Sequence, residues 1–69
     1  MLALSKKENL NKRVLDVGCS NGILLHHLQK MGFDVFGVEV DPHSSKMAKN
    51  IVGDDKIFTG FLSDSPYLD

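Results

Sequence analysis

The sequence lacks the features that would place it outside the cell or on a polyanion. Cys19 is the only cysteine, so the chain cannot form an internal disulfide, which is typical of proteins in a reducing compartment. The formal net charge is −1, and the basic residues form no cluster larger than a pair. This distribution forms no basic patch of the kind that binds nucleic acid. We therefore predict a cytoplasmic protein with no nucleic-acid partner.

Long hydrophobic runs are also missing. The apolar residues 1–4 are soon followed by Lys6, well short of the roughly 7–15 apolar residues of a secretory signal. No stretch approaches the roughly 20 apolar residues that cross a bilayer, so we expect no membrane partner. With 42% hydrophobic and 25% charged residues, the composition is that of a globular segment, and 69 residues allow a single domain over residues 1–69.

What the sequence does contain is an alternation of short apolar runs with helical patterns. Runs of strand type occupy residues 13–17, 34–39 and 56–60. Between them, apolar residues recur at helical spacing over residues 22–31 and 42–52. The second helix has a clear start signal, because an aspartate that can cap the helix precedes a proline suited to the first helical turn.

This alternation predicts an α/β fold of β-α-β-α-β type, preceded by a short amino-terminal helix over residues 4–11. Right-handed crossovers would give a parallel sheet with strand order 3-2-1 and both helices on one face, which is half of a doubly wound fold. The opposite face and the edge of the first strand would then be bare. We therefore predict a homodimer or higher oligomer, formed through that face or that edge.

A glycine-containing turn over residues 18–22 joins the first strand directly to the first helix. Open α/β sheets bind ligands at this end of their strands, and Gly18 permits a close backbone approach. Glu39 ends the second strand, 21 residues after Gly18, where a carboxylate can accept hydrogen bonds from ribose hydroxyls. The glycines could also be plain turn residues and Glu39 a solvated acid. Together on this frame, however, they favour an adenosine-containing ligand.

A dinucleotide fingerprint would need glycine at the third and sixth positions counted from Gly18, where the chain has Ser20 and Ile23. Asp16 also adds negative charge near the ligand, which suits a cationic group better than a diphosphate. An NAD- or nucleotide-binding half of an oxidoreductase nevertheless stays as one alternative. A non-catalytic assembly module is another.

Two segments resemble a known family. Residues 14–22 (VLDVGCSNG) resemble the first motif of class I, Rossmann-type, S-adenosylmethionine-dependent methyltransferases, and residues 37–42 (GVEVDP) resemble the second. The resemblance implies that the turn surrounds the methionine part of S-adenosylmethionine, that Asp16 favours its ammonium group and that Glu39 holds the ribose. The implied cofactor-binding residues are Asp16, Gly18, Cys19, Ser20, Asn21, Gly22, Glu39, Val40, Phe61 and Leu62.

The chain departs from the family pattern in two places. Ser20 stands where many relatives have glycine, and Phe61 follows Gly60 where the family often has an aspartate that reaches the adenine amino group. Adenine recognition would then fall to the backbone of Phe61 and Leu62, or to Asp64. The resemblance also implies that Val40 packs against the face of the adenine.

The family's later strands, which carry most of the acceptor pocket, have no counterpart in this sequence. We therefore expect a fragment with no catalytic residues of its own, and no appreciable methyl transfer by these residues alone. We also predict no metal site, because the histidines His26, His27 and His43 and the single cysteine lack zinc-type spacing.

Overall fold

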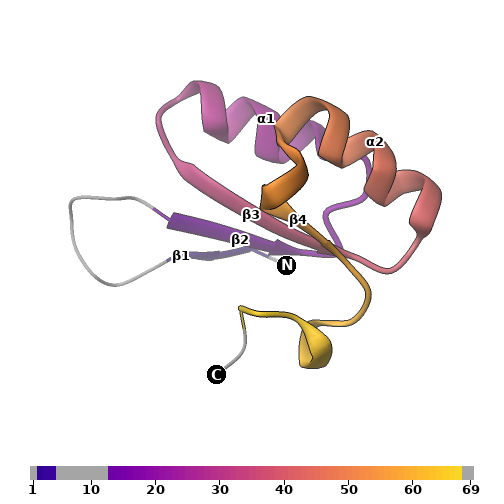
Figure 1. The fold of residues 1–69 in the computed structure, drawn as a ribbon. Coiled ribbons are helices and arrows are strands. Elements are labelled where there is room, and N and C mark those ends of the chain that lie inside the picture. Colours follow the sequence, from indigo (N-terminus) through magenta and orange to yellow (C-terminus); the bar gives the residue numbers. More distant parts are fainter. Residues whose placement is uncertain (1, 5–12, 68–69) are drawn as a thin grey trace.

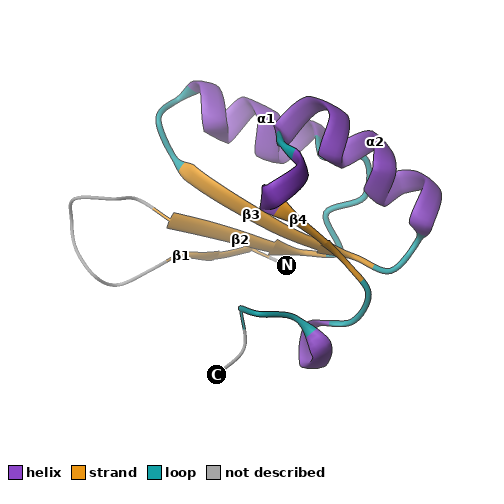
Figure 2. Ribbon diagram, in the orientation of Figure 1, coloured by secondary structure: helices purple, strands orange, loops and turns teal. Residues whose placement is uncertain are grey.

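The computed structural model of the chain describes residues 2–4 and 13–67. Within them, one mixed sheet carries two helices on one face, and the carboxyl-terminal segment passes along the other (Figure 1). Figure 2 shows the two long helices as one layer and the strands as another. The elements are β1 Leu2–Leu4, β2 Arg13–Val17, α1 Ile23–Lys30, β3 Asp34–Glu39, α2 Pro42–Val52 and β4 Ile57–Thr59, with short 3₁₀ turns at Asp54–Lys56 and Leu62–Asp64.

The sheet has the strand order β1-β2-β3-β4. Strands β2, β3 and β4 are parallel, with Val14 opposite Val35 and Gly37 opposite Ile57. The predicted α/β class, with three parallel strands and two helices, is therefore confirmed. Because all three parallel strands point the same way, the segments that follow them meet at one edge of the sheet.

The amino-terminal prediction was wrong where the structure describes it. Leu4, the first residue of the predicted helix, is the last residue of β1, while residues 5–11 lie outside the described residues. Strand β1 pairs antiparallel with β2, placing Leu2 opposite Asp16 and Leu4 opposite Val14. The edge of β2 that was predicted to be open is therefore occupied, since β1 supplies partners for its backbone groups.

The core lies between the sheet and the helices. Leu25 of α1 and Ala48 of α2 are fully buried, and Val35 of β3 is 1% exposed. Helix α2 starts as predicted, with the Asp41 carboxylate accepting a hydrogen bond from the Ser44 N–H at 2.9 Å. Buried apolar residues from five elements and the first turn form one cluster: Val14, Cys19, Leu25, Val35, Ala48, Val52 and Ile57.

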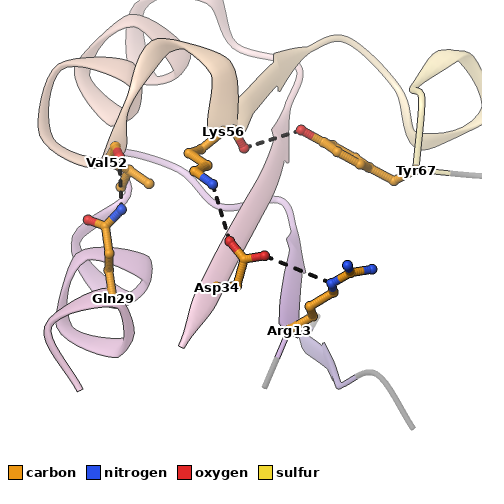
Figure 3. Close-up of polar contacts among 6 residues, drawn as sticks. All are labelled: Arg13, Gln29, Asp34, Val52, Lys56 and Tyr67. Atoms are coloured by element: carbon orange, nitrogen blue, oxygen red, sulfur yellow. Dashed lines mark hydrogen bonds and ion pairs between the residues drawn. The ribbon is translucent and has the colours of Figure 1, made fainter. Parts of the chain in front are cut away.

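The face opposite the helices is partly covered. Side chains alternate along β3, so Phe36 points away from the core that Val35 joins. The Tyr67 ring packs on Phe36 with the ring centroids 5.5 Å apart, and its hydroxyl donates to the Lys56 carbonyl oxygen at 3.3 Å. Figure 3 shows the hydrogen bond between Tyr67 and Lys56 beside Asp34. Asp34 pairs with the ammonium of Lys56 at 3.1 Å and with the guanidinium of Arg13 at 3.8 Å. These ion pairs hold the amino ends of the parallel strands.

Candidate cofactor site

A pocket opens at the other end of the parallel strands, where their carboxyl ends meet. Each wall comes from the end of one strand and the residues after it, and the lining residues are Val17, Gly18, Val38, Glu39, Val40, Gly60, Phe61 and Leu62. Five of the ten residues singled out from the sequence are brought together here. Val17, Val38 and Gly60 were missed. The strand register could have found the two valines, because they lie opposite each other in the pairing of β2 with β3.

The turn after β2 is fastened to the end of β3. The N–H groups of Gly18 and Cys19 both donate to the Val38 carbonyl oxygen, at 2.8 and 3.0 Å. Gly18 and Gly22 have φ angles of +83° and +84°, and Ser20 adopts a φ of +55°. Ser20 thus occupies a left-handed conformation that glycine adopts without strain, which explains why glycine suits this position.

The two glycines of the turn face different surroundings. A Cβ on Gly18 would have no heavy atom within 4 Å, so its bare side faces open space, and Gly18 is one of the residues that line the pocket. A Cβ on Gly22 would lie 2.8 Å from Ala48 Cβ and 2.9 Å from its Cα. Gly22 therefore lets α1 and α2 pack closely, whereas Gly18 leaves space for a ligand to approach the backbone.

Glu39 connects the turn to the start of α2. Its Oε1 accepts a hydrogen bond from the Ser20 N–H at 2.7 Å, and its Oε2 accepts one from the Asp41 N–H at 2.9 Å. A carboxylate oxygen can accept more than one hydrogen bond, so both oxygens retain acceptor capacity. Glu39 is thus held in a fixed position at the pocket while it is still able to bind hydroxyl groups.

Two negative charges act on the thiol of Cys19. Cys19 is 5% exposed and lies against Gly37, where an added Cβ would be only 2.7 Å from the sulfur. Burial, and after it the negative charges of Asp16 and Glu39, raise the pKa of the thiol to about 11. The thiol is therefore protonated at neutral pH and is no nucleophile.

Asp16 lies in β2, opposite Gly37 of β3, and is buried, with 7% of its surface exposed.

Asn21 has a structural role at the start of α1. Its side-chain oxygen accepts a hydrogen bond from the Ile23 N–H at 3.2 Å. This bond satisfies one of the N–H groups that a helix start leaves unpaired. The other five residues singled out from the sequence form or support the turn but do not line the pocket. They are Asp16, Cys19, Ser20, Asn21 and Gly22.

The far end of the pocket is apolar. Val40 follows β3 and is 50% exposed, while Phe61 follows β4 and is 66% exposed. Leu62 completes this end. Asp64, which the sequence offered as a possible adenine contact, is exposed and is not among the lining residues. Such exposed apolar side chains suit the faces of a flat ring.

Over residues 2–4 and 13–67, no three His, Cys, Asp or Glu side chains gather closely enough to hold a metal ion. His26 and His27 are neighbours on α1 with their ring centroids 6.5 Å apart. None of the helices described here is long and apolar enough to cross a membrane.

Comparison with known proteins places this arrangement in a family. Residues 1–66 match the family model described as a methyltransferase domain. The mitochondrial ubiquinone biosynthesis O-methyltransferase of Schizosaccharomyces pombe is 33% identical over 51 residues, which is 74% of this chain. The match covers 19% of that relative's length. The chain therefore belongs to the methyltransferase domain family, as the motifs at residues 14–22 and 37–42 predicted.

Proposed function

We propose that this chain binds S-adenosylmethionine, and its product S-adenosylhomocysteine, as the cofactor-binding segment of a methyltransferase. One observation carries the proposal. The open side of Gly18 and the fixed carboxylate of Glu39 share a pocket with the exposed apolar side chains of Val40 and Phe61. These are the three chemical surfaces that an amino-acid chain, a ribose and a base require.

Each part of the ligand has a matching surface. The backbone of the turn at residues 18–22 would lie along the methionine part. The charges of Asp16 and Glu39 both act on Cys19 within the turn, so ammonium and sulfonium groups would be favoured there. Glu39 would accept hydrogen bonds from the ribose hydroxyls, and Val40, Phe61 and Leu62 would contact the adenine.

When bound, S-adenosylmethionine supplies a methyl group activated by the positive sulfur. The residues described here would hold and orient it, but they supply no evident proton acceptor for a methyl acceptor's hydroxyl or amine. Glu39 is the one ionisable side chain among the described residues that line the pocket, and it already binds two backbone N–H groups. We propose that this chain alone transfers no methyl group at an appreciable rate, and that the acceptor is bound by other residues. We also propose a cytoplasmic location, which suits the unpaired Cys19.

Calorimetric titration of the chain with S-adenosylhomocysteine tests the proposal. We expect saturable binding that Glu39→Ala abolishes and that Glu39→Gln weakens, because a neutral amide accepts fewer hydrogen bonds from ribose. Asp54→Ala is the matched control, since it removes an exposed acid that does not line the pocket. Circular dichroism and urea unfolding of each variant would separate lost binding from lost folding.

Two outcomes would overturn the proposal. The first is absence of binding by a chain that is demonstrably folded. The second is displacement of S-adenosylhomocysteine by NAD at lower concentrations than by S-adenosylmethionine, which would favour the oxidoreductase alternative.

A further inference from the structure

The base end of the pocket has no polar side chain. The lining residues at the ends of β3 and β4 beyond Glu39 are Val40, Gly60, Phe61 and Leu62. Phe61 and Val40 are the most exposed of them, at 66% and 50%, so a planar ring placed here would bury much apolar surface. Affinity at this end therefore comes from contact with the faces of the ring.

The backbone of the segment after β4 offers both N–H donors and carbonyl acceptors, because a carbonyl oxygen that accepts one hydrogen bond keeps a second lone pair. The carbonyl oxygen of Leu62 accepts from the Ser65 N–H at 3.0 Å and from the Ser65 hydroxyl at 2.8 Å. The carbonyl oxygen of Phe61 accepts from the Asp64 N–H at 3.0 Å. The N–H groups of Phe61 and Leu62, in contrast, donate no hydrogen bond to any residue that the structure describes.

Adenine and hypoxanthine differ at the edge of the purine ring that this segment would contact. Adenine carries an amino donor at C6 and an acceptor at N1, whereas hypoxanthine carries an oxygen acceptor at C6 and a donor at N1. A segment that offers both kinds of group can pair an N–H with N1 and a carbonyl oxygen with the amino group of adenine. It can equally pair an N–H with the C6 oxygen and a carbonyl oxygen with the N1–H of hypoxanthine. Strong rejection of an analogue requires a site group that bonds only the substituent being changed, and the lining residues at the base end, Val40, Gly60, Phe61 and Leu62, carry no polar side chain for the amino group.

We propose, on the basis of the cofactor binding proposed above, that this pocket recognises the faces of the purine and not its substituent at C6. S-inosylhomocysteine, in which an oxygen replaces the adenine amino group, therefore binds about as tightly as S-adenosylhomocysteine. The expected difference is under about threefold, within the range of one neutral hydrogen bond. Phe61→Ala weakens both ligands by about fivefold or more, because it removes an aromatic contact common to both.

The test is calorimetric titration of the intact chain with both ligands, carried out on the natural sequence, Phe61→Asp and Ser63→Asp. Phe61→Asp adds a carboxylate that can accept from the amino group, so the preference for S-adenosylhomocysteine should rise to about tenfold or more. Ser63→Asp is the matched control, since Ser63 is exposed on the same segment but does not line the pocket. Its ligand preference should equal that of the natural chain.

The outcomes separate this inference from the function on which it rests. If S-adenosylhomocysteine binds but S-inosylhomocysteine binds at least tenfold more weakly to the natural chain, the inference is overturned while cofactor binding stands. If neither ligand binds to the folded chain, both are overturned. A preference that does not change in Phe61→Asp would also contradict the inference, because the added acid would then not reach the base.

Discussion

Gly18 and Gly22 lie four residues apart in one turn with nearly equal φ angles, yet a methyl group should affect them differently. Gly22→Ala forces a Cβ against the backbone of Ala48, so we expect the unfolding free energy to fall by about 2–4 kcal/mol. Gly18→Ala should lower the unfolding free energy by only about 1 kcal/mol, because its φ angle alone is unfavourable, but it adds a methyl group to a residue that lines the pocket.

Urea unfolding and titration with S-adenosylhomocysteine would check this pair of variants. Gly18→Ala should remain folded and lose most of its affinity. If Gly22→Ala proved as stable as Gly18→Ala, the close packing of α1 against α2 would be incorrect.

Cys19 should make the chain sensitive to alkali. Its pKa is raised to about 11, whereas an unfolded cysteine ionises near 9, so the folded state holds the proton more tightly. The stability from this protonated thiol is complete below about pH 9 and is lost as the pH rises towards 11, by on the order of 2–3 kcal/mol. Burial also raises the pKa of Tyr67, which acts in the same direction at higher pH.

Urea unfolding at pH 8, 9 and 10 would measure this loss. Cys19→Ala, which has no thiol to ionise, is the control and should lose less stability over the same interval. An equal loss in both proteins would show that Cys19 is not responsible.

Some of these residue properties could be read from the sequence and others could not. The end of a strand predicted the position of Glu39, and the small size of Cys19 suited a tight turn. The hydrogen bond that Glu39 accepts from the Ser20 N–H depends on how two segments 19 residues apart approach each other. No local pattern specifies such an approach, so this bond required the structure.

At the scale of elements, Ser45 and Thr59 join α2 to β4. Their hydroxyl oxygens are 2.5 Å apart, and Ser45 is 1% exposed. We expect Thr59→Val to lower the unfolding free energy by about 1–2 kcal/mol, because it leaves the buried Ser45 hydroxyl without this partner. Urea unfolding of the single variants Thr59→Val and Ser45→Ala and of the double variant gives the coupling energy. Strictly additive effects would mean that the two hydroxyls do not interact.

The elements themselves differ in how well the sequence predicted them. Residues 13–17 and 34–39 were predicted as strands, and both are strands with those bounds, since their apolar β-branched character is local. The start of α2 at Asp41 was also predictable, because its signal, a capping aspartate followed by a proline, is local as well. Strand β1 was missed because three residues carry little periodicity, and their conformation depends on pairing with β2.

At the scale of the whole molecule, β1 protects the edge of the sheet. Removing residues 1–4 would uncover the backbone of β2 from Val14 to Asp16. We expect this truncated chain to self-associate more strongly than the intact one, because an unpaired strand edge can pair with a second copy. Light scattering over a range of concentrations would measure the change. Equal association of both chains would show that β1 does not protect the edge.

Self-association of the intact chain through the face of the sheet stays a prediction. The aromatic contact between Tyr67 and Phe36 covers part of that face. The sequence indicated apolar residues on it but could not show that the chain's own carboxyl-terminal segment returns to cover them. That return depends on a turn after Thr59 whose direction is set by contacts across the sheet.

Because of its position, Tyr67 can serve as an intrinsic fluorescence probe of the carboxyl-terminal segment. The sequence has one tyrosine and no tryptophan, so its intrinsic fluorescence comes from a single known place. That place is the contact of the carboxyl-terminal segment with Phe36 and Lys56, on the opposite side of the sheet from the helices. A change in tyrosine emission would therefore report release of this segment from the sheet, independently of any signal from a ligand.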